Sequence, residues 1–259
     1  MTMPTPAPRR VLVTGASGGI GRAVAAAFAA AGDRVAVHYV SKKDSAEETL
    51  AALSGDGHVL VSGDIGAPDA VAGFVAEAAA GLGGIDVLVN NAAVGTTADN
   101  AHRLGEVSYV DWQAVWRRMV DVNLVGAANV IHQVAAVMIE QGAGGRIVNI
   151  GSRGAFRGEP DHPAYGATKA GLHALSQSAA VSLAPHGIAV AAVAPGFVAT
   201  GRTAGRLDGE EGERLRAQSP FGRVGTAEEI AAAVRYLASD EATWAAGTVL
   251  DLNGASHLR

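Results

Sequence analysis

Tyr165 and Lys169 are the residues of this sequence best suited to proton transfer, and Ser152 precedes the tyrosine by thirteen positions. If the segment after Pro163 is helical, a spacing of four places the phenol and the ammonium on one face, roughly 5–6 Å apart at Cβ. A cation at this distance stabilises a tyrosinate, and lowering the pKa of a phenol by one unit takes roughly 1.4 kcal/mol. Such a tyrosine can act as an acid or a base near neutral pH. The same spacing also occurs in ordinary exposed helix pairs, so the rest of the chain must decide between the two interpretations.

The composition is typical of a globular protein and excludes several kinds of site. The chain has 259 residues, of which 49% are hydrophobic, with 34 Gly and no Cys. The lack of cysteine excludes disulfides, thiol nucleophiles and thiolate metal sites, and we expect no metal site. The net charge of −5 argues against a nucleic-acid partner, which would need a basic patch.

The start of the chain and its hydropathy predict a soluble, cytoplasmic protein. Residues 1–8 contain three prolines and no apolar core, so we expect a flexible lead rather than a signal peptide. No apolar run is expected to reach the length of a membrane span, and we expect no membrane partner. Residues 9–259 are enough for one α/β domain with a substantial core.

Short apolar segments alternate with helical segments along the whole chain. We expect strands at 9–14, 34–40, 58–62, 85–89, 146–150, 188–194 and 248–252. We expect helices at 22–31, 44–53, 68–82, 108–139, 163–185 and 226–237. This alternation is typical of βαβ units with a parallel sheet that is covered on both faces. Segment 94–107 is a predicted loop, and 197–219 is a predicted mobile substrate loop.

A glycine-rich stretch lies between the first predicted strand and the first predicted helix. Glycines let the backbone approach a pyrophosphate, while the amides and the dipole of the helix start attract the anion. A plain tight turn is the alternative, because the spacing departs from the strict G-x-G-x-x-G form. The residues expected at a nucleotide cofactor are Gly15, Ser17, Gly18, Gly19, Ile20 and Gly21.

Seven motifs follow predicted strands or lie on the next helix. They are Thr14-Gly15-Ala16-Ser17-Gly18-Gly19-Ile20-Gly21, Asp64, Asn90-Asn91-Ala92, Asn123, Ser152, Tyr165-x-x-x-Lys169 and Pro195-Gly196. In this order they resemble the classical short-chain dehydrogenase/reductase family, most of all its 3-oxoacyl-carrier-protein reductase branch, from about Arg9 to Ala255. The resemblance implies a single-domain, Rossmann-type, doubly wound parallel sheet of about seven strands, and an oxidoreductase that interconverts a secondary alcohol and a ketone.

The resemblance also implies a catalytic set of Asn123, Ser152, Tyr165 and Lys169. Tyr165 would exchange a proton with the substrate oxygen while hydride passes to or from the nicotinamide. Lys169 would lower the pKa of Tyr165 and hold the nicotinamide ribose. Ser152 would donate a hydrogen bond to the substrate oxygen. Asn123 would bind a water of a proton relay, or would instead be a buried asparagine bonded to neighbouring backbone.

Further cofactor contacts follow from the same resemblance. Asp64 and the amide of Ile65 would meet the adenine, and Asn90 would lie beside the adenine ribose. The remaining expected contacts are Tyr39, Ser41, Lys42, Asn91, Ala92, Pro195, Gly196, Val198 and Thr200, together with Tyr165 and Lys169.

The end of the second predicted strand favours NADP(H) over NAD(H). Family members that prefer NAD have an aspartate here, which accepts hydrogen bonds from the adenosine ribose. This chain has Tyr39, followed by Ser41, Lys42 and Lys43. A 2′-phosphate requires charge-assisted donors, which the lysines supply. The family's other NADP marker, a basic residue within the glycine loop, is absent, so NAD(H) stays possible.

The substrate is predicted only by class. Gly154, Phe156, Glu159, His162 and the loop 197–206 are expected near it. Carrier-protein reductases place basic residues where this chain has Ala143 and His186, which favours a free ketone or alcohol as substrate.

Several alternatives stay open. They are a 3-oxoacyl-carrier-protein reductase, a sugar or polyol dehydrogenase using NAD(H), a dehydratase or epimerase on the same fold, and a nucleotide-sensing protein without turnover. By resemblance we also expect a homotetramer, with 112–139 and the tyrosine helix at one interface and the last helix and strand at another.

Overall fold

A seven-stranded parallel sheet runs through the computed structural model, which describes residues 7–259. The central strands are short, apolar and buried on both faces, as is usual when helices cover both sides of a sheet, whereas the edge strands β3 and β9 are partly exposed. Their order is β3-β2-β1-β4-β5-β6-β9, with every neighbouring pair parallel. The bounds are β1 Arg10–Val13, β2 Arg34–Tyr39, β3 Val59–Ser62, β4 Val87–Asn90, β5 Gly145–Ile150, β6 Ile188–Pro195 and β9 Val249–Leu252.

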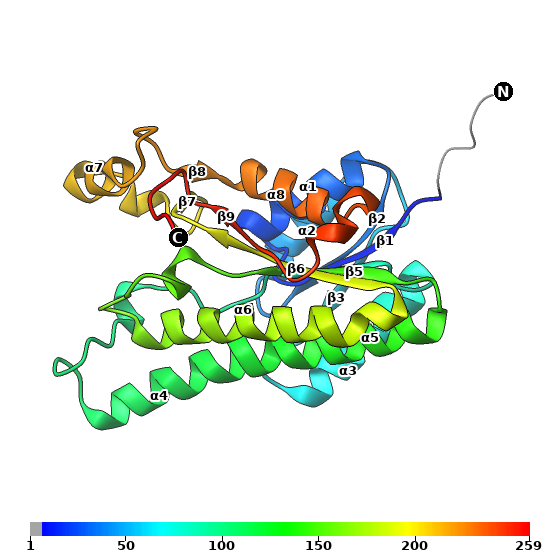
Figure 1. Ribbon diagram of the computed structural model, residues 1–259, viewed down its shortest axis with the longest axis horizontal. Coiled ribbons are helices and arrows are strands. Elements are labelled where there is room, and N and C mark those ends of the chain that lie inside the picture. The colour runs from blue at the N-terminus through cyan, green and yellow to red at the C-terminus, as the bar shows by residue number, and fades with distance from the viewer. Residues whose placement is uncertain (1–6) are drawn as a thin grey trace.

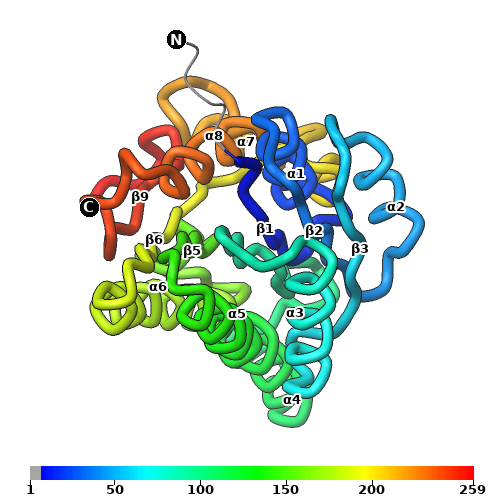
Figure 2. Tube along the Cα trace, turned by 90° about the vertical axis from the view of Figure 1, so that its right-hand side faces the viewer, coloured from blue at the N-terminus to red at the C-terminus, as the bar shows by residue number. Residues whose placement is uncertain are grey.

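Helices cover both faces of this sheet, as Figures 1 and 2 show. One face carries α1 (Gly19–Ala30), α2 (Lys43–Ala51) and α8 (Ala227–Leu237), with Phe28 and Val234 fully buried between helix and sheet. The other face carries α3 (Pro68–Leu82), α5 (Ala127–Gln141) and α6 (Pro163–Leu183), with Phe74 and Met138 in its core. The core is therefore divided into two layers, one on each side of the sheet.

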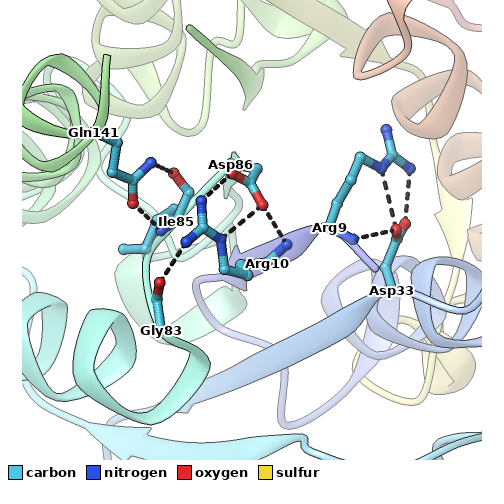
Figure 3. A network of polar contacts seen from close by, with 7 residues as sticks. All are labelled: Arg9, Arg10, Asp33, Gly83, Ile85, Asp86 and Gln141. Carbon is cyan, nitrogen blue, oxygen red and sulfur yellow. Dashed lines mark hydrogen bonds and ion pairs between the residues drawn. The ribbon is translucent and has the colours of Figure 1, made fainter. Parts of the chain in front are cut away.

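Polar contacts fix the amino ends of β1 and β4 (Figure 3). The backbone N–H and Nε of Arg10 each donate to Oδ2 of Asp86 at 2.8 Å. The Gln141 side chain, at the end of α5, accepts from the Ile85 amide at 2.7 Å and donates to its carbonyl at 2.8 Å. These bonds hold the central strands and α5 together at the edge opposite to the carboxyl ends of the strands.

α4 (Tyr109–Val120) and α5 form one helix of 33 residues, joined by the π turn η2 (Asp121–Gly126). Its apolar part has a mean hydropathy of 1.6 and is long enough to cross a membrane. The prediction that no apolar run reaches this length was therefore wrong. Half of that stretch is buried, and residues such as Val130 and Met138 pack in the core beside α3. Core helices of water-soluble folds pass the same test of length and hydropathy.

The predicted alternation of seven strands and six helices is confirmed. The N-cap of α8 also forms as expected, because the Glu229 amide donates to Thr226 Oγ1 at 3.2 Å and the Thr226 amide donates to Glu229 at 2.9 Å. α1 starts at Gly19 rather than at the predicted residue 22, since the last turn of the glycine loop is already helical. Residues 1–6 of the predicted flexible lead lie outside the described residues.

Segment 197–219 is more regular than predicted. It contains β7 (Val198–Ala199), the short turn η5 (Ala204–Arg206) and the helix α7 (Gly209–Ala217). β7 pairs with β8 (Gly225–Thr226), and the whole excursion lies at the carboxyl ends of the strands (Figure 1). The helix α7 was missed because its two glycines and many charges hide its short apolar side, where Leu215 is 9% exposed.

Candidate active site

The predicted site residues follow six of the parallel strands. Because parallel strands end at the same edge, these residues gather at the carboxyl edge of the sheet, and the order of the strands reverses there between β1 and β4. They are 14–21 after β1, Tyr39 at the end of β2, Asp64 after β3, Asn91 after β4, Ser152 after β5 and Gly196 after β6.

Lys169 is buried on α6, and its ammonium is held by the end of β5. Its Nζ donates to the Ile150 carbonyl at 2.7 Å and lies 5.9 Å from the centre of the Tyr165 ring. Burial, together with the smaller effect of the nearby charge of Arg202, lowers the pKa of Lys169 to about 8. The predicted helical face is therefore formed, but the ammonium is directed toward β5.

The phenol of Tyr165 is the proton donor that this arrangement favours. Burial raises the pKa of Tyr165, while a hydrogen bond with Ser152 and the charge of Arg202 lower it by less. The predicted lowering of this pKa by Lys169 stays a prediction, because the ammonium is bonded to the Ile150 carbonyl of β5 in this structure. Tyr165 is accordingly a neutral phenol near pH 7, the form that can donate a proton to a substrate oxygen.

Ser152 begins the short turn η3 (Arg153–Ala155) that leads from β5 toward α6. Its Oγ accepts a hydrogen bond from the Gly154 amide at 3.0 Å. This bond fixes the hydroxyl beside Tyr165, so one end of α6 and the end of β5 present two hydroxyl groups to the same point. A carbonyl oxygen placed there would meet both donors.

Asn123 lies in the π turn η2 and is 1% exposed. Its Oδ1 accepts from the Val94 amide at 2.7 Å, and its Nδ2 donates to the Val94 carbonyl at 3.0 Å and to Thr168 Oγ1 at 3.4 Å. The side chain thus joins the loop after β4 to α6, which matches the alternative of a buried asparagine bonded to backbone. Its part in a proton relay stays a prediction. A π turn often marks a functional position in a helix, and no pattern in the sequence indicates this one.

The glycine loop fits a phosphate group. Gly18 is the residue before α1, it provides no side-chain cap, and a Cβ built on it would meet nothing within 4 Å. The first amides of α1 therefore face open space without an acceptor from a neighbouring side chain. A Cβ on Gly21 would lie 2.4 Å from the Gly15 carbonyl, so only glycine allows the loop to fold this tightly. This shape supports the prediction of a nucleotide cofactor over a plain turn.

Thr14 and His38 hold the glycine loop, although neither was selected among the predicted site residues. Thr14 Oγ1 accepts from the amides of Asn91 and Ala92 at 2.9 and 3.0 Å. His38 accepts from the Gly15 amide through Nδ1 at 3.1 Å, and its Nε2 donates to a carbonyl at the end of β3 at 2.9 Å. A histidine in the middle of an apolar strand was the sequence signal that could have identified this role.

The adenosine side of the loop carries three cations, two of which have partners among the described residues. Arg22 donates to the Ser17 carbonyl at 3.1 Å and to Thr49 Oγ1 at 2.8 Å, which ties the glycine loop to α2. Lys43 pairs with Glu47 at 3.4 Å. Lys42 is exposed and has no ion pair among residues 7–259. Arg22 was missed because it follows the loop instead of lying within it.

The residues predicted to meet the adenine and its ribose differ in exposure. Asp64 is partly exposed, and the Gly66 amide, followed by Arg118, lowers the pKa of its carboxyl group. Ile65 and Asn90 are almost completely buried, and Asn90 donates to the Ala127 carbonyl at 3.0 Å. The assignment of these residues to the cofactor stays a prediction.

The loop after β6 closes the site from the other side. A Cβ on Gly196 would lie 2.9 Å from the backbone of Asn253, so Pro195-Gly196 packs tightly against the chain that follows β9. Val198 is buried, and the Thr200 amide donates to Thr203 Oγ1 at 2.8 Å.

Two hollows lie near the site. A shallow groove of about 510 Å³ is lined by Gly154, Phe156 and Glu159 with the first turns of α6. A cavity of about 310 Å³ lies behind the loop after β6 and is lined by Arg153, Leu215 and residues of the C-terminal tail. Neither is lined by Tyr165, so the reacting centre is placed where the hydroxyl groups of Ser152 and Tyr165 lie next to one another. His162 bonds to the Thr97 carbonyl at 2.9 Å and so links two loops.

Comparisons with known proteins agree with this geometry. Residues 15–257 match the family model described as "Enoyl-(Acyl carrier protein) reductase". The chain is 37% identical over 252 residues to the 3-oxoacyl-[acyl-carrier-protein] reductase FabG of Staphylococcus aureus (strain Mu50 / ATCC 700699), covering 96% of this chain and 98% of the relative. It is 37% identical over 253 residues to the L-rhamnose 1-dehydrogenase (NAD(P)(+)) of Sphingomonas sp. (strain SKA58), covering 96% of each.

A solved structure is also similar over most of its length. The crystal structure of a short chain dehydrogenase from Burkholderia cenocepacia J2315 in complex with NADP has a TM-score of 0.84 and 31% sequence identity. The similarity covers 96% of this chain and 97% of that chain.

The bonds of His38 predict a pH-dependent stability. Burial lowers the pKa of His38 to about 4, from 6.5. As the pH falls from 6.5 toward 4, the unfolded chain binds a proton that the folded chain does not, so the free energy of unfolding decreases by about 1.4 kcal/mol per unit. Urea unfolding at pH 7.5 and 5.0 should show a smaller loss in His38→Gln than in the wild type. Equal losses would contradict this role, whereas His173, whose pKa burial also lowers to about 4, contributes equally to both proteins.

Proposed function

Because the chain belongs to the short-chain dehydrogenase/reductase family of oxidoreductases, we propose that it interconverts a secondary alcohol and a ketone with NADP(H) as cofactor. The observation that carries the proposal is that Ser152, Tyr165 and Lys169 lie together at the carboxyl edge of the sheet. At the same edge, the glycine loop leads into α1, whose first turn has no side-chain cap. The chain would act as one domain of residues 9–259.

Each residue of the site has its own role in the proposed reaction. The bound nicotinamide supplies or accepts the hydride. Tyr165 donates the proton to the ketone oxygen, or accepts it from the alcohol, and Ser152 donates a second hydrogen bond that stabilises the charge on that oxygen. Lys169 would hold the ribose hydroxyls of the bound cofactor, and Asn123 keeps the loop after β4 against α6.

Around these residues, the glycine loop and the predicted contacts at Asp64, Ile65, Asn90, Asn91, Ala92, Pro195, Gly196, Val198 and Thr200 form the cofactor site. No residue of the proposed mechanism requires a metal.

We propose a free ketone or alcohol as substrate rather than an acyl chain on a carrier protein. Ala143 and His186, at the two positions where carrier-protein reductases have basic residues, are both exposed here and provide no fixed positive charge. The similarity to FabG keeps a 3-oxoacyl-carrier-protein reductase as the second candidate, and the similarity to L-rhamnose 1-dehydrogenase keeps a sugar dehydrogenase using NAD(H) as the third.

The Tyr165→Phe variant tests the reaction class. Loss of the phenol hydroxyl removes the proton donor, so kcat should fall by about 10²-fold to 10⁴-fold. The measurement is the absorbance at 340 nm with a panel of ketones and secondary alcohols. Tyr109→Phe is the control, because Tyr109 is 73% exposed at the start of α4.

Unchanged turnover in Tyr165→Phe would remove the proposed mechanism. Wild-type protein that binds NADPH but turns over no member of the panel would instead favour a nucleotide sensor, and turnover without a change at 340 nm would favour a dehydratase or epimerase.

The preference for NADP(H) is supported by the cations beside Tyr39 and Ser41. Lys42 is exposed without an ion pair among the described residues, whereas Lys43 is paired with Glu47. The end of β2 and the four residues after it, 40–43, contain no carboxylate that would repel a 2′-phosphate or accept from a ribose hydroxyl.

The Lys42→Ala variant tests this preference. Loss of one charge-assisted contact to the 2′-phosphate should raise KM for NADPH about tenfold and leave KM for NADH nearly unchanged. Lys43→Ala is the matched control and should change neither value. A wild-type enzyme with the higher kcat/KM for NADH would overturn the assignment of the cofactor.

We further propose a cytoplasmic homotetramer. Large apolar side chains are exposed on the elements predicted to form its interfaces, namely Val181 on α6, Tyr236 on α8 and Trp244 before β9, which is 100% exposed. Exposed apolar groups of this size favour burial against another copy of the chain.

Sedimentation equilibrium tests the assembly. The wild type should sediment with four times the mass of one chain, and Trp244→Asp should yield smaller species because it places a charge in the second interface. Leu104→Asp is the control, since Leu104 is 74% exposed on the loop after β4. A wild-type monomer would refute the proposal.

A further inference from the structure

Arg202 is a cation at the mouth of the catalytic site that no family motif identified. The Cζ and Nη1 atoms of its guanidinium lie 3.0 Å from where a Cβ on Gly95 would be. Gly95 follows Val94, which Asn123 holds beside α6. The guanidinium therefore borders the site on the side of the loop after β4.

The loop that carries Arg202 crosses from the cofactor to the substrate. The Thr200 side chain faces the glycine loop, with its methyl group 3.4 Å from a Cβ built on Gly19. Two residues later, Arg202 packs on Gly95 instead. The Arg202 side chain thus lies beyond the expected position of the cofactor, on the side of the substrate.

The charge of Arg202 is not neutralised within the described part of the chain. It makes no ion pair or hydrogen bond with residues 7–259, whereas Arg206 on the same loop pairs with Glu211 at 2.7 Å and stacks on Phe197. Its charge acts on both Tyr165 and Lys169, whose pKa values it lowers.

An opposite charge lies on the other side of the site. Glu159, which raises the pKa of Tyr165, packs against Gly154 and Gly166 near the start of α6. Glu159 disfavours an anionic group beside Tyr165 on the α6 side, although Arg157 lines the same groove, whereas Arg202 attracts the group to the Gly95 side and can donate two parallel hydrogen bonds to it.

We propose that Arg202 binds an anionic group of the substrate, a carboxylate or a phosphate, and so selects charged ketones over neutral ones. This inference rests on the proposed function, because it names the substrate class of the same site. Gly95 takes part in the selection, since a Cβ there would lie 3.0 Å from the guanidinium and would make it shift.

Pairs of ketones that differ in charge test the proposal. Wild-type enzyme with NADPH should have a higher kcat/KM for acetoacetate than for methyl acetoacetate if the bound group is a carboxylate. It should have a higher kcat/KM for dihydroxyacetone phosphate than for dihydroxyacetone if the bound group is a phosphate. Arg202→Gln should raise KM for the preferred anion about 30-fold with little change in kcat, because the contact is the same before and during hydride transfer. Values for the neutral partner should stay within about twofold.

Two further variants test whether the effect depends on the position and on the guanidinium group of Arg202. Arg206→Gln, on the same loop but already paired, should leave the preference unchanged. Arg202→Lys keeps the charge without the planar fork and should recover part of the affinity. Equal losses for charged and neutral ketones in Arg202→Gln, or a raised KM for NADPH alone, would overturn the inference, and the second result would assign Arg202 to the cofactor.

Binding without turnover separates this inference from the proposed function. Calorimetric titration of acetoacetate and dihydroxyacetone phosphate into the NADP⁺ complex should give a weaker Kd in Arg202→Gln than in the wild type. If turnover of all ketones is absent but this difference is present, the proposed function fails and the anion site stands. If neutral ketones are reduced and neither anion binds, the anion site fails and the proposed function stands.

Discussion

The hydroxyl of Thr14 accepts hydrogen bonds from two successive backbone amides, those of Asn91 and Ala92, and joins the carboxyl ends of β1 and β4. Thr14 is completely buried, so the loss of these bonds would leave polar groups without partners. The two strands are those between which the order of the sheet reverses, where the glycine loop and the loop after β4 diverge. The opening into which a cofactor can fit depends on this junction, and His38 supports it from the next strand.

A second constraint is the low polarity around Tyr165 and Lys169. Burial disfavours the charged forms of both groups, so the phenol keeps its proton while the ammonium loses its own more readily. The Ile150 carbonyl compensates the lysine through one short bond. Since both groups lie on α6 and are bonded to residues at the end of β5, the position of α6 relative to β5 determines how they face a substrate.

Most of the fold could be predicted because the sequence patterns that indicate it each lie within a short segment of the chain. Hydrophobic periodicity, strand length and the glycine loop each reflect backbone requirements within about ten residues, and the seven strands of the main sheet and the six predicted helices formed close to where they were expected. The predicted catalytic residues also gathered at one edge, because parallel strands leave no other arrangement. The sequence did not predict the direction of the Lys169 ammonium, the bonds of Asn123 to Val94, or the approach of Arg202 to Gly95. These depend on contacts between segments far apart in the chain, which no local pattern records.

The π turn at 121–126 has a consequence for the long helix that contains it. A π turn holds one residue more than an α turn, and one residue rotates a helix by about 100°. The side-chain pattern of α4 is therefore out of phase with that of α5, although the backbone is continuous. Substitutions that change the outer surface of α4 need not disturb the pattern by which α5 packs on the sheet. The residues of α4 and those of α5 can therefore change in sequence independently of one another. Asn123 lies in the π turn, where the side-chain pattern shifts from one to the other.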